Sequence, residues 1–517
     1  MEPHFRMTGL KSLDRMIAES AGSRRSAMLW TIFVFLLVAA GFVLRLWGLS
    51  KMHYWDEAVY LQNAEVICCG KANYSELNSR PPLLSLFFVF VYLFWHHIYA
   101  ACIGTALLNA SAPALLFAAG RRIVGRLAAA IAALLLAFSP FFVGVILPGW
   151  GSDNTGNSLL SDCPALTLIL LSLWLVLRAL EKQAGKQSAK QSEKQASLLF
   201  ALAGLVMAMA VLMRFASLSS VGMIGLLTLT AERRWRSAAA CSLGFAAGIA
   251  PYLCWSRWSY GGFLTTFREG WLNFDGPEES FFFYLRNFSI IFGWITVAGL
   301  ALWIVKTAWQ WRQKTRLNAP AVRAVAESGL KLEGFLCLWA VVIFFFFSLL
   351  SHKEPRYALP VAPPLLLLAG AGLSVLVKGR RRAVRAAGTL LLAGGLIYAF
   401  WPTTQIFQNP FLDNEVYDQI VVSEYLTRTL PANAVLYSVV DYPVFAYYTN
   451  LKVVPVLGTG NELYETLESL PDDGVFIAYK ESDTADGPRL SWLDANPHFK
   501  RLREFPTIVV YSYRVRD

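Results

Sequence analysis

The chain has 517 residues, of which 56% are hydrophobic and only 16% are charged. About a quarter of the residues in an average soluble domain are charged, so this composition excludes an ordinary soluble enzyme and indicates a polytopic membrane protein. The net charge of +11 could suggest nucleic acid as a partner, but residues 403–517 carry a net −7 and residues 1–402 a net +18. Positive charge confined to the membrane half is typical of cytoplasmic loops, so no nucleic acid partner is expected.

Eleven apolar runs are long enough to cross a bilayer, whose hydrocarbon core needs about 20 helical residues. The first run follows the polar, basic residues 1–28 and is too long for the apolar part of a cleavable signal peptide. We interpret it as a retained anchor with a cytoplasmic N-terminus. The predicted spans are residues 29–49, 99–119, 127–147, 164–180, 198–213, 215–231, 238–258, 286–305, 334–351, 358–377 and 386–402.

Residues 82–98 form a twelfth apolar run that begins at Pro82 and is rich in aromatic residues. If this run crossed the membrane, three Lys/Arg-rich loops would lie outside. If it lies in the membrane interface, all of them are cytoplasmic, as the positive-inside rule requires. The sequence therefore predicts a re-entrant or interfacial helix at residues 82–98.

This threading divides the polar loops into two groups of different composition. The cytoplasmic loops are rich in Lys and Arg, and they comprise residues 120–126, 181–197, 232–237, 306–333 and 378–385. The extracytoplasmic loops carry carboxylates, histidines and aromatic residues, and they comprise residues 50–81, 148–163, 259–285, 352–357 and the tail from 403. We expect any chemistry on the second side.

The tail alternates between two kinds of segment. Its β-like runs are residues 434–440, 475–479 and 507–513, and its helix-like segments are residues 415–430, 442–449 and 462–470. The sequence predicts a small extracytoplasmic α/β domain over residues 403–517.

The first outer loop opens with two consecutive carboxylates, Asp56 and Glu57, with Tyr60 close behind. Charge beside a membrane is costly and commonly functional, although carboxylates at a helix start also favour the helix dipole. Successive side chains point in different directions, so one carboxylate can face a pocket while the other braces the loop. The same loop ends at Arg80-Pro81-Pro82, where Arg80 is either a phosphate clamp or an interfacial anchor.

Two further charged groups lie at the ends of later spans. Asp162 precedes Pro164 at the start of a span, where it either caps the helix or contributes to a site. Arg214 lies between two spans on the outer side, as an interfacial anchor or as a cation of the site.

The loop at 352 carries the densest group of polar side chains. Four titratable residues lie within five positions between two apolar spans, which indicates that they face a polar cavity or pair with one another. His352 could act on protons or a metal, Lys353 and Arg356 could hold phosphate oxygens, and Tyr357 could stack on a sugar. The charged and aromatic members are His352, Lys353, Glu354, Arg356 and Tyr357.

The seven cysteines have no spacing typical of a metal site. Cys68 and Cys69 are adjacent and form either a reactive pair or two ordinary small apolar residues on a loop helix.

Together these groups gather acids, cations and aromatic rings on the outer membrane face. Cations would bind a phosphate, the apolar flank would take a lipid chain, and an aspartate would deprotonate an acceptor hydroxyl. The sequence therefore predicts a site for a lipid-linked phosphosugar.

The same residues resemble a known family. Trp55-Asp56-Glu57-Ala58 with Tyr60, Arg80-Pro81-Pro82-Leu83, Asp162 before a span, and His352 with Arg356-Tyr357 and Leu359-Pro360 resemble the C-type integral-membrane glycosyltransferases (GT-C). They are most similar to the RgtA/B/C/D-like branch of the protein O-mannosyltransferase and aminoarabinose-transferase superfamily. Residues 352–357 are also similar to the His-Lys-Glu-x-Arg-Phe motif of GPI-anchor and dolichol-pathway mannosyltransferases.

The resemblance implies a polytopic all-α GT-C domain over residues 29–402, with its catalytic loop at 50–81, in a bacterial inner (plasma) membrane. It implies an inverting transfer of a hexose or pentose from a polyprenyl-phosphate donor to a lipid, glycan or protein acceptor. Asp56 would be the general base or orient the acceptor, supported by Glu57. Arg80 and Arg356 would hold the donor phosphate, and Asp162 would shape the acceptor side.

One departure bears on cofactors. Aminoarabinose-type members carry Glu-Lys-Pro where this chain has Ser79-Arg80-Pro81, and that glutamate helps to hold a metal. No cofactor is therefore expected with certainty, and a divalent metal stays an open alternative.

Two other classes compete with a glycosyltransferase. A flippase or transporter of lipid-linked sugars would need charges at mid-span and paired broken helices in two halves, whereas the charges here cluster at span ends and no internal repeat is visible. A scaffold that presents the tail is the third alternative.

Overall fold

The computed structural model describes residues 8–47, 55–71, 73–138, 140–143, 159–184, 189–231, 234–272, 279–316, 320–378, 381–401, 414–458, 460–480 and 487–515. The membrane half is helical, and its α-helices are α1 (Thr8–Trp47), α2 (Trp55–Cys69), α3 (Leu83–Tyr92), α4 (Ile98–Ile123), α5 (Arg126–Phe138), α6 (Pro140–Val143), α7 (Asp162–Ala184), α8 (Ala189–Met213), α9 (Leu218–Leu227), α10 (Arg234–Tyr260), α11 (Thr265–Leu272), α12 (Phe283–Arg286), α13 (Phe288–Phe292), α14 (Trp294–Arg316), α15 (Pro320–Ser348), α16 (Ala362–Val377) and α17 (Arg382–Phe400). Short 3-10 helices are η1 (Phe215–Ser217), η2 (Thr228–Thr230) and η3 (Pro355–Val361).

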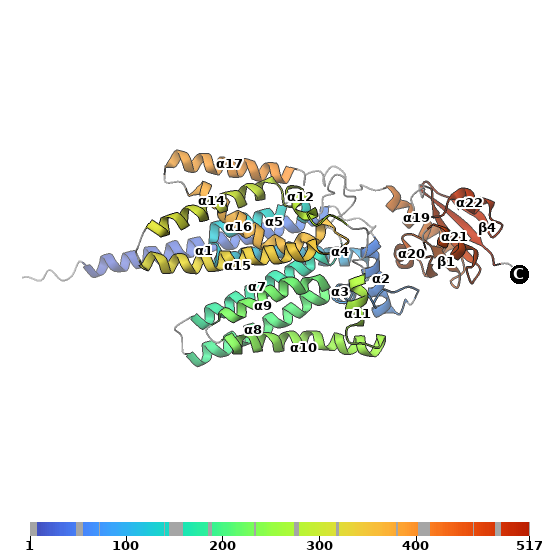
Figure 1. Ribbon diagram of the computed structural model, residues 1–517, viewed down its shortest axis with the longest axis horizontal. Coiled ribbons are helices and arrows are strands. Elements are labelled where there is room, and N and C mark those ends of the chain that lie inside the picture. Colours follow the sequence, from blue (N-terminus) through green and yellow to red (C-terminus); the bar gives the residue numbers. More distant parts are fainter. Residues whose placement is uncertain are drawn as a thin grey trace, which may run out of the picture.

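Long helices run roughly parallel to one another as a bundle (Figure 1). Close packing between α8 and α10 depends on two glycines. A Cβ added to Gly204 would lie 1.9 Å from the carbonyl oxygen of Cys241, and one added to Gly244 would lie 1.9 Å from that of Ala201. The two backbones therefore touch at positions where any larger side chain would force them apart.

Six helices of the described residues are long and apolar enough to cross a membrane: Ala27–Leu46, Ile98–Ile123, Asp162–Gln183, Gln191–Met213, Arg234–Tyr260 and Pro355–Val377. These match six of the predicted spans and confirm a multi-pass membrane protein. Other predicted spans coincide with the shorter apolar segments Arg126–Phe138, Phe215–Thr230 and Leu332–Ser348, and with α14 and α17. The span predicted from residue 286 begins later, because Gly293 has a φ of +78° and separates α13 from α14.

α3 is too short to cross the membrane. Its ten residues extend about 15 Å at 1.5 Å per residue, half of the ~30 Å hydrocarbon core. The helix begins at Leu83, directly after Pro81 and Pro82. This agrees with the prediction that residues 82–98 do not span.

The C-terminal part is a small α/β unit, as predicted. Its elements are α19 (Asn414–Thr429), β1 (Val435–Ser438), α20 (Tyr442–Tyr448), β2 (Lys452–Pro455), α21 (Asn461–Glu468), β3 (Gly474–Tyr479), α22 (Leu490–Ala495), β4 (Phe499–Glu504) and β5 (Ile508–Tyr513). The five-stranded sheet has the order β2-β1-β3-β5-β4. β1 pairs in parallel with β2 and β3, whereas β5 pairs antiparallel with β3 and β4.

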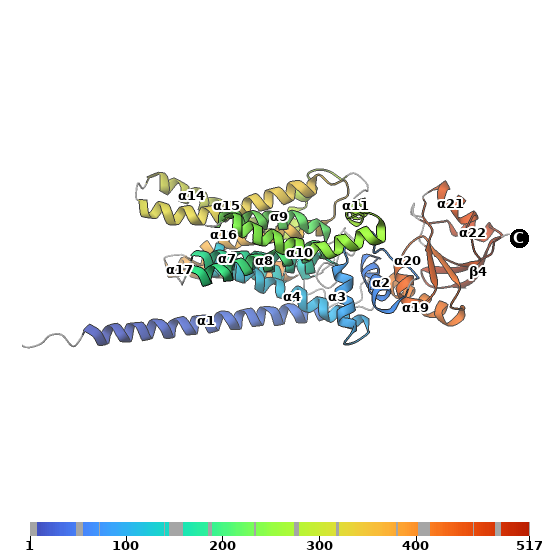
Figure 2. The ribbon, with the colours of Figure 1, turned by 90° about the horizontal axis from the view of Figure 1, so that it is seen from below.

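The two ends of the bundle differ in what they carry. The C-terminal unit lies at one end, next to α2, and the C-terminal ends of α7, α14 and α16 lie at the other (Figures 1 and 2). Four arginines gather with Glu181 at that other end, namely Arg121, Arg122, Arg126 and Arg178. Among the described residues, this arginine cluster and the carboxylates of α2 are thus at opposite ends of the bundle.

Candidate active site

Asp56 lies between two arginines that come from distant parts of the chain. Its Oδ1 is 2.9 Å from a terminal nitrogen of Arg80, and its Oδ2 is 3.0 Å from one of Arg356. Burial alone would raise the pKa of Asp56, but the charges of Arg80 and Arg356 outweigh it and lower that pKa to about 2. The carboxylate is therefore ionised, and it bridges the first turn of α2, the end of the first loop and η3.

Arg80 is positioned by a second acid that the sequence did not single out. Its Nε donates to Oε2 of Glu76 at 2.9 Å, and the hydroxyl of Tyr74 donates to the other oxygen of Glu76. The Arg80 guanidinium also lies 5.2 Å from the ring centroid of Trp55, within the range of a cation–π contact. The four-residue separation of Glu76 and Arg80 was the available signal, although the chain between them is a turn.

The loop at 352 pairs internally around Glu354. Its Oε1 accepts from Nε2 of His352 at 2.9 Å, from Arg356 at 3.0 Å and from the hydroxyl of Tyr357 at 3.1 Å. Burial would raise the pKa of Glu354, but the charge and hydrogen bond of Arg356 lower it overall. Glu354 thus orients the side chains of this loop.

Asp162 and Arg214 form a second ion pair beside the first. Oδ2 of Asp162 accepts from Arg214 at 2.9 Å, and the Arg214 guanidinium lies 5.2 Å from the ring centroid of Tyr357. The carboxyl of Asp162 is 1% exposed, so it reaches the cavity only through Arg214. Next to it, the hydroxyls of Tyr60 and Ser161 are 3.1 Å apart.

These side chains surround a cavity of about 220 Å³. The residues selected from the sequence that line it are Asp56, Tyr60, Arg80, Arg214, His352, Glu354, Arg356 and Tyr357. Residues that were not chosen as candidates complete the wall, and two of them flank Arg80 in its motif. They are Ser79, Pro81, Phe215, Ala216 and Gly270. At Gly270 a Cβ would come within 2.8 Å of the carbonyl oxygen of Ser79, so only glycine lets α11 approach the loop there.

Glu57 and Lys353 face away from this cavity. An oxygen of Glu57 accepts from the backbone nitrogen of Leu159 in the second outer loop. Nζ of Lys353 donates to the carbonyl oxygen of Glu279 at 2.8 Å and to that of Leu350. Both side chains are buried, and in these positions they brace loops. Lys353 therefore does not line the cavity in which it was expected to hold phosphate oxygens. Glu57 takes the bracing position that the sequence allowed for one of the two carboxylates.

The carboxylates of the cavity are not arranged as a metal site. Asp56 and Glu354 both contact guanidinium groups, and three arginines line the same space. Serine stands at position 79, where the family resemblance would place the metal-holding glutamate. The described lining residues therefore do not fit a divalent cation, and they fit an anion.

The C-terminal unit contacts the back of this site. The ring of Tyr442 lies edge-on to Trp55, with centroids 5.6 Å apart, and to Tyr74 at 5.3 Å. Nδ2 of Asn73 donates to three carbonyl oxygens of this unit: Ala446 at 2.8 Å, Leu451 at 3.1 Å and Thr449 at 3.3 Å. The loop that positions Arg80 is thus held between the bundle and α20.

Comparisons with known proteins place this geometry in context. A model of the Alg9-like mannosyltransferase family matches residues 25–434. The chain is 29% identical over 160 residues to undecaprenyl phosphate-alpha-4-amino-4-deoxy-L-arabinose arabinosyl transferase 2 of Pseudomonas fluorescens, a match that covers 31% of this chain and 25% of that protein. The chain therefore spans about a quarter of the length of the curated relative that it matches.

Two solved structures share the fold. ArnT from Cupriavidus metallidurans, bound to undecaprenyl phosphate, superimposes with a TM-score of 0.63 at 17% identity, over 93% of this chain and 98% of that one. The Archaeoglobus fulgidus oligosaccharyltransferase tethered to an acceptor peptide gives a TM-score of 0.59 at 13% identity, over 88% of this chain and 69% of that one.

Proposed function

The chain belongs to the Alg9-like mannosyltransferase family, and from this premise we propose that it transfers a sugar from a polyprenyl-phosphate donor to an acceptor hydroxyl. Family membership confirms the glycosyltransferase class that the motifs predicted. ArnT, which shares the fold, binds undecaprenyl phosphate in its crystal structure, and AglB from Archaeoglobus fulgidus has been captured with dolichol phosphate. These lipids support the choice of donor class.

One observation supports the proposal most: a single carboxylate, Asp56, is shared by two arginines that line a polar cavity at the end of a membrane bundle. Two guanidiniums that each contact an oxygen of one carboxylate are suited to the oxygens of one phosphate, which they can bind through paired hydrogen bonds. We infer that the donor phosphate, when it binds, replaces Asp56 as a partner of Arg80 and Arg356.

This exchange would also prepare Asp56 as a base. At a pKa of about 2 a carboxylate is a weak proton acceptor, but its pKa rises when a phosphate anion takes over its cationic partners. Asp56 then accepts the proton of the acceptor hydroxyl as that oxygen forms a bond to the anomeric carbon. The bond from that carbon to the phosphate oxygen breaks, and polyprenyl phosphate leaves with the electron pair, held by Arg80 and Arg356.

The remaining site residues have supporting roles in this proposal. Arg214, positioned by Asp162, lies beside Tyr357 and would contact the sugar or the phosphate. Glu354 and His352 keep Arg356 oriented. Attack from the side opposite the leaving phosphate gives inversion, and the acceptor is a lipid, a glycan or a protein.

The positive-inside rule supports an extracytoplasmic site. Because the arginine-rich end of the bundle is opposite α2, whose first turn carries Asp56, the beginning of α1 and that end belong to the cytoplasm. The cavity and the C-terminal unit then face outward across a bacterial inner membrane. A flippase is not favoured, because the paired charges of the cavity lie at span ends and the family is one of transferases.

The variant Asp56→Asn tests the assignment of the base. Purified protein is incubated with a panel of polyprenyl-phosphate sugars, and the released polyprenyl phosphate is measured along with donor binding. We expect turnover to fall by about 10² to 10⁴, the usual contribution of a general base. Donor affinity should hold or increase, because the neutral amide of the variant no longer competes with the phosphate for the arginines.

Asp472→Asn is the matched control, since Asp472 is exposed in the C-terminal unit. It should leave both measurements unchanged. Turnover retained in Asp56→Asn would rule out Asp56 as the base, and a loss of donor binding without loss of turnover would reverse the proposed roles.

A further inference from the structure

A second cluster of reactive side chains lies at the other end of α2, outside the cavity. Glu65, Cys68 and Cys69 occupy one face of the last turn of this helix, since residues three and four apart are neighbours. His96 reaches the same point from the segment that follows α3. Glu65 and His96 are 31 positions apart in the chain, so no spacing pattern could reveal the group.

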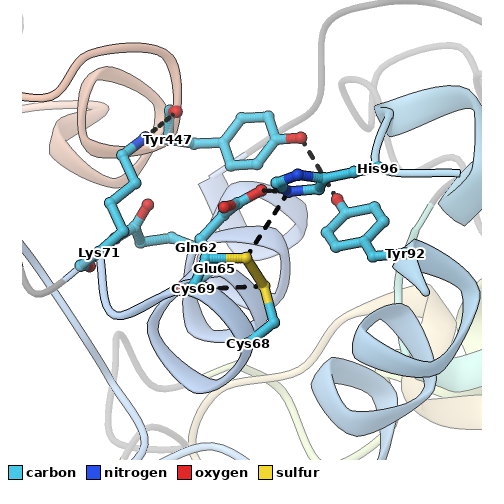
Figure 3. The surroundings of a disulfide bond; sticks show 8 residues. All are labelled: Gln62, Glu65, Cys68, Cys69, Lys71, Tyr92, His96 and Tyr447. Carbon is cyan, nitrogen blue, oxygen red and sulfur yellow. Dashed lines mark hydrogen bonds and ion pairs between the residues drawn. A yellow bond between two sulfur atoms is a disulfide. The ribbon is translucent and has the colours of Figure 1, made fainter.

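The four side chains converge on a small volume (Figure 3). One ligand atom from each of Glu65, Cys68, Cys69 and His96 lies within 4.8 Å of all the others. Nε2 of His96 is 2.9 Å from Oε1 of Glu65 and 3.9 Å from Sγ of Cys69. Cys68 and Cys69 are joined by a disulfide and are exposed, which contradicts their interpretation as ordinary apolar residues.

The donor set is the one that zinc prefers. Two thiolates, one imidazole and one carboxylate are the common protein ligands of Zn²⁺. Bonds of about 2.0 to 2.3 Å place the ligand atoms of a tetrahedral site about 3.3 to 3.8 Å apart. The distances of 2.9 and 3.9 Å are within a few tenths of an ångström of that range. Reduction of the disulfide would free the two sulfurs to separate to the same range. His96 is half-exposed, which leaves the ion a path from solvent.

The cluster is separate from the cavity but close to the C-terminal unit. Asp56 begins α2, and residues nine to thirteen positions further along lie about 14 to 20 Å away at 1.5 Å per residue. The ring of His96 is 5.0 Å from that of Tyr92, whose hydroxyl is 3.3 Å from that of Tyr447 in α20. A bound ion would fasten the end of α2 to the segment after α3, beneath the contact with α20.

We propose that the reduced Cys68–Cys69 pair, together with Glu65 and His96, binds Zn²⁺, and that the disulfide is the metal-free form of this site. Two molecules of a thiol reductant deliver two electrons and two protons to the disulfide and leave as their own disulfide. Zn²⁺ then displaces the two thiol protons, which pass to the buffer. This inference does not depend on the proposed function.

The test uses the full-length protein in detergent. One portion is reduced with a phosphine, which is then removed, and the other portion is kept oxidised. Zn²⁺ is titrated against a chromophoric chelator. We expect one Zn²⁺ per reduced chain and affinity at least ~100-fold weaker in the oxidised one. Cys69→Ser and His96→Ala should each weaken binding at least ~10-fold, and Co²⁺ bound to the reduced protein should show thiolate charge-transfer absorption.

Two matched controls share the residue types but lie outside the cluster. Cys254→Ser alters another exposed cysteine, and His97→Ala alters the neighbouring histidine, which accepts from the backbone nitrogen of Tyr99. Both should bind zinc as the unaltered chain does. The proposal is overturned if the reduced chain takes up no zinc, if the oxidised chain binds equally well, or if the controls weaken binding as much as the cluster variants.

Discussion

At the scale of single residues, the site is a network of ion pairs between four acids and three arginines. Asp56, Glu76 and Glu354 contact Arg80 or Arg356, and Asp162 contacts Arg214. A buried charge that loses its partner costs more than the pair contributes. Each substitution here therefore acts on the residue that remains as well as on the one removed.

Arg80→Gln should weaken the binding of polyprenyl phosphate by about 10- to 100-fold, because a hydrogen bond to a charged group contributes about 1.5 to 3 kcal/mol. Arg80→Lys keeps the charge but cannot contact Asp56 and Glu76 at once, so its affinity should be intermediate. Binding is measured by equilibrium titration with a fluorescent polyprenyl phosphate. Arg286→Gln, at an exposed arginine of α12, is the control, and an equal loss there would show that only net charge matters.

Substitutions of Glu57 test whether this buried acid next to Asp56 takes part in catalysis or only braces the second outer loop. Its oxygen accepts from the backbone nitrogen of Leu159, so Glu57→Ala leaves that buried donor unsatisfied and should destabilise the fold by about 1 to 3 kcal/mol. Glu57→Gln retains an acceptor oxygen and should keep most of the stability and turnover. Thermal unfolding and the separate values of kcat and KM are measured for both. A glutamine variant that is stable but inactive would assign Glu57 to the chemistry.

At the scale of elements, the loop after α2 is the point where the bundle and the C-terminal unit are joined. Asn73 donates to three carbonyl oxygens around α20, and Oδ1 of the same side chain accepts from Gln62 at 2.6 Å. Asn73→Ala should therefore increase hydrogen–deuterium exchange in α20, and Asn73→Asp should do so more strongly, because its carboxylate would face carbonyl oxygens. Asn450→Ala is the control in the same region, since Asn450 is exposed. If exchange in α20 is unchanged in Asn73→Ala, the contacts of Tyr442 with Trp55 and Tyr74 are sufficient to hold α20 against the first loop.

Lys71 makes this junction sensitive to pH. Burial lowers its pKa to about 8 although Glu65 opposes that shift, whereas the unfolded chain keeps the ordinary value of about 10.4. Between these values the unfolded chain binds more protons, so the contribution of Lys71 to stability rises with pH across this window and is smallest below pH 8. When the pH is raised from 7.5 to 10, the unfolding temperature of the unaltered chain should rise relative to that of Lys71→Met. If the unfolding temperatures of the two proteins changed with pH in parallel, the lowered pKa of Lys71 would be contradicted.

The elements also show where sequence reasoning reached its limit. Apolar runs and loop composition located the helices and the loops that meet at the cavity, because burial in lipid demands those patterns. β2 and β4 were missed. Both are edge strands of the sheet, and the exposed residues of β4 include Lys500 and Arg501. The directions of Glu57 and Lys353 depend on contacts between loops that are distant in the chain, which no local pattern encodes. The contact of Glu76 with Arg80 is local, but it forms in a turn, where a four-residue separation does not by itself predict a contact.

At the scale of the whole molecule, the site lies where three parts meet: the bundle, the first loop and the C-terminal unit. All of the described residues that line the cavity precede residue 358. The C-terminal unit supports the loop from behind, through Tyr442 against Trp55 and Tyr74. Phosphate binding should therefore belong to the bundle, whereas the position of the first loop, and with it Asp56 and Arg80, should depend on the complete molecule.

Removal of residues 403–517 distinguishes the hypothesis of a transferase from that of a scaffold protein. In a transferase the truncated chain should still bind polyprenyl phosphate within about tenfold, a change of about 1.4 kcal/mol, and should retain slow donor hydrolysis while transfer to the acceptor falls. A scaffold that presents the tail would lose every activity. Truncation also exposes the apolar face of α2 around Ala58, which packs on Val444 in the complete chain. A control that keeps this contact is a chain cleaved at a protease site inserted between α17 and α19. The cut chain should keep full transfer while the C-terminal unit stays docked, so loss of transfer on cutting would mean that covalent connection, and not contact with α20, maintains the site.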